Sequence, residues 1–141
     1  MKIGSAVPPP KAEGVKNKRP QLAIDQVFKT LRSGLKIYVE RSGDGPKVVN
    51  GSQVKVHYDG WLAEDYSKFD SSRDKRRPFE FELGAGKVIK GWDEGLEGLR
   101  AGSKIQLIIP AKLAYGKAGV PSMGIPEDAE LIFKVEVLKV T

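Results

Sequence analysis

Residues 68–95 read KFDSSRDKRRPFEFELGAGKVIKGWDEG, and this stretch decides how the rest of the chain is organised. It places Phe69, Phe79 and Trp92 far apart among charged residues and glycines. A core segment would carry fewer charges, and a solvent-exposed loop would carry fewer large apolar rings. The mixture is typical of a concave apolar site held by loops and a short helix. Composition alone leaves a second interpretation equally open, in which the rings are ordinary core and the charges are ordinary surface.

Composition excludes several kinds of chemistry. The 141 residues contain no cysteine and one histidine, His57. Disulfides, thiol nucleophiles, cysteine-rich zinc sites and multi-histidine metal sites are therefore excluded, and we expect no metal and no cofactor. No run approaches the ~18 apolar residues of a membrane span, and the N-terminus lacks the apolar segment of a secretory signal. We therefore expect a cytoplasmic protein, with the nucleus as the alternative, and no membrane partner.

The net charge of +6 is concentrated at the N-terminus. Residues 1–34 contain seven Lys or Arg against two Asp or Glu, whereas residues 35–141 contain seventeen against sixteen. This distribution does not support a basic globular face for nucleic acid. We expect any contact with nucleic acid or another polyanion to be weak and confined to the N-terminal arm.

The N-terminal quarter of the chain divides into two segments. Residues 1–20 are rich in proline, lysine and glycine, and we predict a disordered basic arm because they bury too little apolar surface to offset the entropy of ordering. Residues 21–34 predict a short amphipathic helix ending at Gly34. Its apolar residues recur with the spacing of one helix face: Ile24, Val27, Phe28 and Leu31. Such a helix must dock on the domain or on a partner, and we expect a monomeric protein.

From residue 35 the apolar residues recur at every second position, which indicates β-strands. The segments with this pattern lie at 35–39, 54–58, 79–83, 105–109 and 131–137. Between Gly84 and Gly98, a short helix could place Val88, Ile89, Trp92 and Leu96 on one face. We therefore predict an α+β fold for residues 35–141, with a twisted five-stranded antiparallel β-sheet wrapped around one short central helix.

Three apparent functional motifs are better explained by structural roles or are incomplete. Residues 84–87 read GAGK, but both phosphate-binding patterns require further residues that the neighbouring positions lack. Asp93, Glu94 and Glu97 are better explained as a solvated helix face than as metal ligands. His57 is better explained as a hydrogen-bonded structural histidine than as a base.

An aromatic pocket with few ionisable groups remains as the candidate site. Its candidate residues are Tyr58, Phe69, Phe79, Trp92, Tyr115 and Phe133, with Val88 and Ile89 as aliphatic neighbours and Asp70 as the one acid. Such a pocket suits an apolar ligand that carries amide groups. It does not suit hydrolysis, which needs a nucleophile and a proton carrier.

Six segments of the chain resemble the FKBP-type peptidyl-prolyl cis–trans isomerases, the immunophilins that bind tacrolimus and rapamycin. They are VHYDGWL (56–62), KFDSSRD (68–74), PFEF (78–81), KVIKGWDEGL (87–96), AYG (114–116) and AELIFKVEVLKV (129–140). The resemblance covers the chain from about Gly34 to the C-terminus, and the family fold agrees with a sheet around a helix. It implies that residues 35–141 form an isomerase domain that assists protein folding, acts on proline-containing peptides and proteins, and binds macrolides.

The resemblance also implies a role for each matching residue. A proline pocket would be formed by Tyr58, Phe69, Phe79, Val88, Ile89, Trp92 and Phe133. Trp92 would be its floor, and the backbone N–H of Ile89 would bind a substrate carbonyl. Tyr115 would offer its hydroxyl to another carbonyl, and Asp70 would bind polar ligand atoms and help to hold Tyr58.

One segment departs from the family pattern, and a second segment has a role that the sequence does not decide. The loop at 116–127 is one residue longer than in the best-known small members, and Val120 stands where those members carry a histidine. Val120, Met123 and Ile125 are all candidates to face the ligand, and we include Val120 and Ile125 in the ligand site. Lys75, Arg76 and Arg77 form either a basic lip or a solvated turn, and we favour the turn.

Three functional alternatives to an enzyme stay open at this point. The pocket could grip proline-containing chains without turnover, as a binding module or chaperone. The basic arm could dock nucleic acid or acidic proteins. The predicted helix at 21–34 could mediate self-association through its apolar face. The intact set of pocket residues favours the enzyme.

Overall fold

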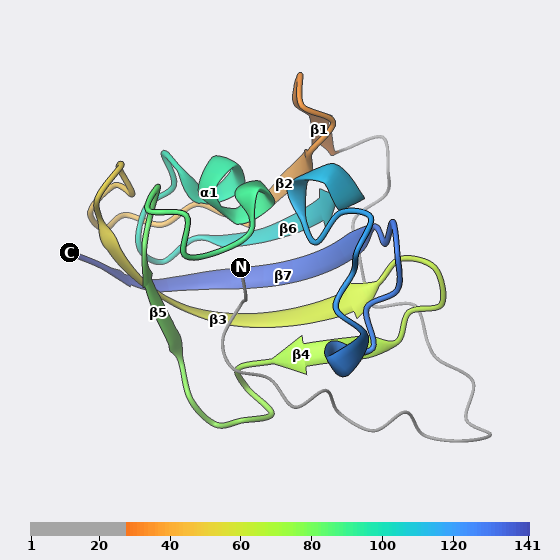
Figure 1. The fold of residues 1–141 in the computed structure, drawn as a ribbon. Helices are drawn as coiled ribbons and strands as arrows, with labels where there is room; N and C mark the ends of the chain where they lie inside the picture. The colour runs from red at the N-terminus through yellow and green to blue at the C-terminus, as the bar shows by residue number, and fades with distance from the viewer. Residues whose placement is uncertain (1–27) are drawn as a thin grey trace.

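The computed structural model describes residues 28–141, whose strands form one antiparallel sheet (Figure 1). The strands are β1 (Lys29–Thr30), β2 (Lys36–Arg41), β3 (Gln53–Leu62), β4 (Lys68–Ser71), β5 (Phe79–Glu82), β6 (Lys104–Ile109) and β7 (Leu131–Val140). Their order across the sheet is β1-β2-β6-β7-β3-β4, and β5 pairs with β3. The predicted α+β class is confirmed, but the sheet has seven strands where we predicted five.

The long strands follow from their alternating sequence. In β3 the side chains alternate between exposed or half-buried and buried from Gln53 to Leu62. This alternation exposes one face and buries the other, as expected for a sheet covered on one side. β4 escaped prediction because it is four residues long and its last three residues are all buried, so it has no alternation to detect. The second strand that we missed, β1, has two residues.

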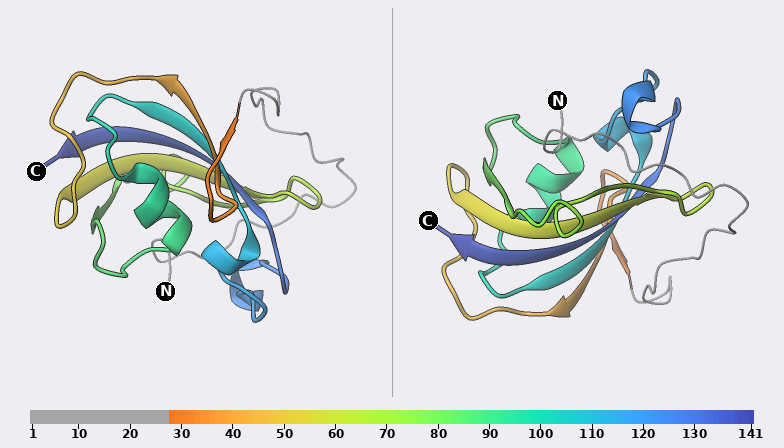
Figure 2. Two further views of the ribbon diagram at one scale, coloured as in Figure 1. Left: turned by 90° about the horizontal axis from the view of Figure 1, so that it is seen from above. Right: turned by 90° about the horizontal axis from the view of Figure 1, so that it is seen from below.

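The short helix α1 (Lys90–Leu96) lies against one face of the curved sheet (Figures 1 and 2). Two glycines that weaken it as a helix also let it approach the sheet closely. A Cβ on Gly91 would lie 2.6 Å from Cγ2 of Ile109, and one on Gly95 would lie 2.9 Å from Cδ2 of Leu107. The hydrophobic core fills the space between α1 and the sheet, with Trp92 and Leu96 fully buried.

Two 3-10 turns lie between β6 and β7. They are η2 (Ala111–Leu113) and η3 (Pro121–Met123), and they belong to the segment that carries Tyr115 and the 116–127 loop. No helix within residues 28–141 is long and apolar enough to cross a membrane.

The predicted disordered arm at 1–20 lies outside the described residues, as does most of the predicted helix at 21–34. The described end of that helix is not helical, which corrects the prediction there. Lys29 pairs with Ile37 of β2, and a turn closed by Gly34 at φ 96° joins the two strands. The ring of Phe28 lies 5.9 Å from the ring of Tyr38. Its apolar side chain is therefore buried by strand pairing rather than on a helix face.

Candidate active site

Five of the six aromatic residues predicted for the site form one group of rings around Trp92. The centroid of its ring lies 5.1 Å from that of Tyr58, 5.4 Å from Phe133 and 6.1 Å from Phe79. The interplanar angles are 80°, 82° and 71°, so each contact is edge to face, the geometry that aromatic quadrupoles favour. The side chain of Trp92 can therefore move little without disturbing its neighbours.

Five separate elements supply these rings. Tyr58 comes from β3, Phe69 from β4, Phe79 from β5, Phe133 from β7 and Trp92 from α1. All are buried except Phe79, which is half-buried and so forms the exposed rim of the group. Phe69 meets Phe133 edge to face at 5.5 Å.

A glycine makes room for that contact. A Cβ on Gly60 would lie 2.8 Å from the ring atoms Cε1 of Phe133 and Cζ of Phe69. Real Cβ atoms are essentially never this close to another heavy atom. The absence of a side chain on β3 at this position therefore allows the two rings to pack against the strand.

Asp70 lies beside the aromatic group and is almost completely buried, with 2% of its side chain exposed. One carboxylate oxygen accepts a hydrogen bond from the Tyr58 hydroxyl at 2.6 Å. The other accepts the Ser71 backbone N–H at 2.9 Å and lies 3.0 Å from the ammonium of Lys75. The predicted contact between Asp70 and Tyr58 is thus present, and Lys75 supplies the cation that a buried carboxylate needs.

The environment of Tyr58 keeps its hydroxyl protonated. Burial raises the pKa of Tyr58 well above its ordinary value of 10.0, and the hydrogen bond to Asp70 raises it further. Tyr115 and Asp59 add smaller electrostatic contributions in the same direction. At neutral pH, Tyr58 can therefore donate a hydrogen bond, but it cannot act as a base.

The start of α1 places two polar groups at the aromatic site. Val88 and Ile89 are buried, and Ile89 is the N-cap residue of the helix. Within residues 28–141, the backbone N–H of Ile89 donates to no protein acceptor. The Nε1–H of Trp92 is also buried without a hydrogen-bond partner among these residues. Both groups are donors whose hydrogen-bonding capacity is unused in this part of the chain.

The loop after η2 packs the remaining candidates against the hydrophobic core. Tyr115 is half-buried and packs against the core cluster. Val120 and Ile125 pair through two backbone hydrogen bonds of 2.9 Å and 3.1 Å. Ile125 and Met123 are buried members of the core cluster, whereas Val120 is only partly buried. Val120 therefore keeps exposed surface, and contact of Val120 and Ile125 with a ligand stays a prediction.

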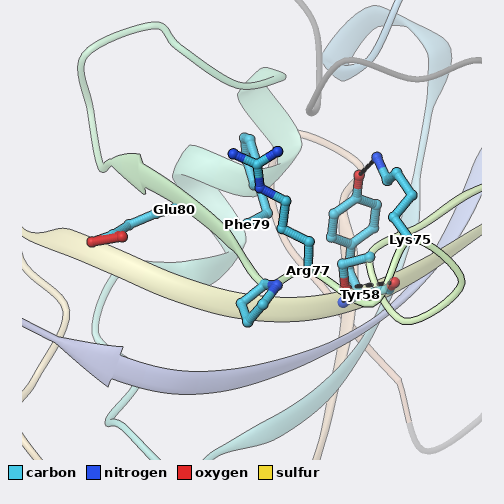
Figure 3. Close-up of a pocket in the computed structure, with 7 residues that line it drawn as sticks. Tyr58, Lys75, Arg77, Phe79 and Glu80 are labelled. Carbon is cyan, nitrogen blue, oxygen red and sulfur yellow. Dashed lines mark hydrogen bonds between the residues drawn. The ribbon is translucent and has the colours of Figure 1, made fainter.

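A cavity of about 410 Å³ opens beside the aromatic group (Figure 3). Its lining residues are Tyr58, Ser72, Lys75, Arg77, Pro78, Phe79 and Glu80. The sequence segment at 75–77, for which we favoured a solvated turn, therefore has two residues at a cavity. The third, Arg76, does not line it.

Several contributors to the site were missed by sequence reasoning. Lys75 follows Asp70 by five residues, a spacing without meaning until the turn between them is known. Phe81 stacks on Phe79 at 5.6 Å and contacts Trp92 at 5.7 Å. The alternation of β5 puts these two phenylalanines on one face and could have revealed this.

His57 has the structural role that we predicted. Its Nδ1 lies 2.8 Å from the hydroxyl of Ser72, which accepts the Tyr58 backbone N–H at 2.7 Å. The three residues thus hold β3 to the segment that follows β4. His57 alternates with Tyr58 along β3, so the two side chains point to opposite faces of the sheet.

Comparison with known proteins agrees with this geometry. A family model described as FKBP-type peptidyl-prolyl cis-trans isomerase matches residues 45–138. The chain is 50% identical over 107 residues to an FK506-binding protein of Neisseria meningitidis serogroup B, covering 76% of this chain and 96% of that protein. It is 47% identical over 110 residues to the peptidyl-prolyl cis-trans isomerase Fkbp12 of Drosophila melanogaster, covering 76% and 98%.

Solved structures give the same result. FkpA from Escherichia coli matches with a TM-score of 0.75 and 43% identity, over 82% of this chain and 52% of the FkpA chain. This chain thus spans about half the length of FkpA. AtFKBP13 matches with a TM-score of 0.74 and 37% identity, over 81% of this chain and 98% of that chain.

Proposed function

The chain belongs to the family of FKBP-type peptidyl-prolyl cis–trans isomerases, and we propose that the aromatic group around Trp92 is where it accelerates rotation about X–Pro bonds. The observation that carries this proposal is a box of edge-to-face rings, buried except at Phe79, with unused backbone and indole donors beside it. Such a box accepts a proline ring and excludes water.

The physics of the amide bond explains how such a box accelerates rotation. Resonance gives the C–N bond double-bond character and a rotation barrier of about 18–20 kcal/mol. In the twisted transition state this resonance is lost, and the charge separation of the amide falls. A dry aromatic environment therefore favours the twisted amide over the planar, solvated one. Each tenfold acceleration needs about 1.4 kcal/mol of such differential binding.

Named residues of this chain have roles in that step. We propose that the Ile89 N–H holds a substrate carbonyl, and the proposal is supported by the lack of an acceptor for it within residues 28–141. The Tyr115 hydroxyl is proposed to bind a second carbonyl. Asp70 orients Tyr58 through the 2.6 Å hydrogen bond, and Lys75 in turn neutralises Asp70. None of these roles moves a proton, in keeping with the raised pKa of Tyr58.

The test is an NMR exchange assay on a short X–Pro peptide with the full chain as catalyst. We expect exchange well above the uncatalysed rate, which has a time constant of tens of seconds or more. Phe79→Leu should lower kcat/KM by about tenfold, because it removes the half-buried rim of the pocket. Tyr38→Leu is the matched control, since Tyr38 is also a half-buried aromatic on a strand but lies outside the site. The proposal is wrong if the wild-type protein gives no acceleration, or if both variants lose activity equally.

The finer assignments belong to the same proposal. We propose that the pocket binds macrolides of the tacrolimus and rapamycin type. Support comes from the similarity to proteins named FK506-binding protein and from the aromatic box itself. In an NMR titration with either macrolide, the signals of the pocket rings should shift, and the signals of the loop that carries Val120 and Ile125 should shift as well. Saturation without any change in that loop would remove Val120 and Ile125 from the ligand site.

The effect of the protein on client refolding distinguishes an enzyme from a binding module. We propose that turnover, rather than grip, assists client proteins whose refolding is limited by X–Pro isomerisation. Asp70→Val or Phe133→Tyr should then lower the isomerase rate and the rate of client refolding together. Refolding that persists after isomerisation is lost would favour the binding module. The monomeric state, the cytoplasmic location and the weak contact of the arm with polyanions stay predictions.

A further inference from the structure

The cavity of about 410 Å³ beside the aromatic group contains residues that the isomerase mechanism does not use. It shares Tyr58 and Phe79 with the pocket, and the centroids of those two rings are 6.0 Å apart. An extended chain advances about 3.3–3.6 Å per residue. A substrate whose proline occupies the aromatic box can therefore place a residue one or two positions away in this cavity.

The charged groups around the cavity are not equivalent. Lys75 is paired with Asp70 at 3.0 Å and lies over the Tyr58 ring. Arg77 is exposed and makes no ion pair with any residue of 28–141. Figure 3 shows Arg77 beside Phe79, whereas the carboxylate of Glu80 extends away from both cations. Of the two cations at the cavity, Arg77 is thus the one with no acidic partner within residues 28–141.

The surroundings of Arg77 suit a carboxylate. A guanidinium presents a planar set of donors that matches the two oxygens of a carboxylate, and bidentate pairs are stronger than point-charge pairs. Pro78 and Phe79 line the same cavity and can cover the methylene groups of an acidic side chain. Lys75 is already paired with Asp70, so the positive potential of the cavity comes mainly from Arg77.

We propose that this cavity is a specificity subsite that takes the side chain of a glutamate or aspartate close to the proline of the substrate. Arg77 is its recognition residue, and Glu80, on the opposite side, weakens the preference. The inference rests on the proposed isomerase function for the position of the proline. It adds the substrate class: acidic peptides and proteins with an acidic residue within two positions of an X–Pro bond.

The experiment compares matched peptides that differ by one charge. Four positions are varied in turn: the two residues before the proline and the two residues after it. Each varied position carries Glu in one peptide and Gln in its partner. Leu directly precedes the proline in every peptide except those in which that position is the varied one. For each pair, kcat/KM is measured by NMR exchange, which avoids a coupling protease with its own preferences, and Kd is measured by NMR titration. The full chain is used, as wild type and as Arg77→Gln, Glu80→Gln and Lys139→Gln.

We expect a Glu/Gln preference of about fivefold at one position in the wild type, the upper range for an exposed ion pair. Arg77→Gln should reduce this ratio to about one, Glu80→Gln should increase it, and added salt should reduce it. Lys139→Gln removes an exposed cation on β7 outside the cavity and should leave the ratio unchanged. A preference of one or less at every position, or a preference that survives Arg77→Gln, overturns the proposal.

The two proposals fail in different ways. If no peptide is accelerated, the isomerase proposal fails, and the subsite is then judged by the Glu/Gln ratio of Kd values alone. If all peptides are accelerated equally, the isomerase proposal stands and the acidic subsite is wrong. If Lys139→Gln lowers the ratio as much as Arg77→Gln, the preference comes from the net charge of the protein, and the subsite is wrong as well.

Discussion

Replacing Lys75 by methionine should destabilise the protein by about 2 kcal/mol, because the buried carboxylate of Asp70 loses its cation. The Lys75 ammonium lies 3.0 Å from Asp70, whose side chain is 2% exposed, while that of Lys75 is 37% exposed. Removing one partner of a fully buried pair costs about 3–5 kcal/mol, and an exposed pair contributes about 0.2–1 kcal/mol. The cost of removing Lys75 should lie between these limits, because Asp70 still accepts hydrogen bonds from the Tyr58 hydroxyl and the Ser71 N–H.

Urea denaturation measures this loss, and the thermal midpoint should fall by about 4–8 °C in parallel. The decisive measurement is a double-mutant cycle. In an Asp70→Asn background the carboxylate is neutral, so Lys75→Met should cost little. The difference between the two backgrounds isolates the ion pair from other effects of shortening the lysine side chain.

Arg76→Met is the control for the loop itself. Arg76 lies next to Lys75, is exposed and forms no ion pair within residues 28–141. Its replacement should change stability by less than about 0.5 kcal/mol. The electrostatic argument is refuted if Lys75→Met costs no more than this control, or if it costs the same with Asp70 and with Asn at that position.

Three other substitutions test the packing of the site and an ion pair outside it. Gly60→Ala would place a Cβ 2.8 Å from the Phe133 ring and should cost about 1–3 kcal/mol in urea denaturation, together with a fall in isomerase rate. Trp92→Leu should cost about 3 kcal/mol and lower kcat/KM at least tenfold, because it removes the proposed floor of the pocket; activity that survives would exclude Trp92 as the floor. The hydrogen bond from Arg73 holds the pKa of Glu136 below its ordinary value of 4.5, so the stability it contributes is present above that pH and is lost as the pH falls through the lowered pKa. Glu136→Gln should therefore flatten the acid limb of a stability–pH curve, and an unchanged limb would show that the pair is not stabilising.

The parts of the fold that the sequence predicts are those with a regular apolar period. β3 and β7 each run for ten residues and bury alternate side chains over most of their length, so periodicity alone identifies them. β4 has no such signal. It pairs with β3 through Asp59 opposite Ser71 and Gly60 opposite Asp70. This pairing exists only in the folded structure and leaves no periodic pattern in the sequence. Short strands of this kind are determined by their partners rather than by their own residues.

The N-terminal error has the same origin. Phe28 and Leu31 fit one face of a helix, and three-residue spacing is also compatible with a strand and a turn. Pairing of Lys29 with Ile37 resolves this in favour of the strand, because β2 offers backbone partners and a Tyr38 ring for Phe28. A marginal helix has no comparable partner within its own sequence.

The residues of the site that could be predicted from the sequence are those that also belong to the hydrophobic core. Large aromatic residues dispersed among charges indicate a pocket, and the resemblance assigns their roles by position. The ion pair between Lys75 and Asp70 was not predictable, because it closes across a turn whose shape includes Arg76 at φ 54°. Backbone of this kind is uncommon for a residue other than glycine and is not encoded by any simple period.

Stability and activity should be coupled at Tyr58 and separable at the rim. The ring of Tyr58 packs against Trp92 at 5.1 Å, while its hydroxyl binds Asp70, which binds Lys75. A substitution in this chain of contacts alters the core and the site at once. Phe79 is only half-buried and Arg77 is exposed, so changes there should affect the proposed substrate contacts with little effect on the core. Substrate preference can therefore change at the cavity without loss of the fold, whereas the rotation step depends on residues that the fold also requires.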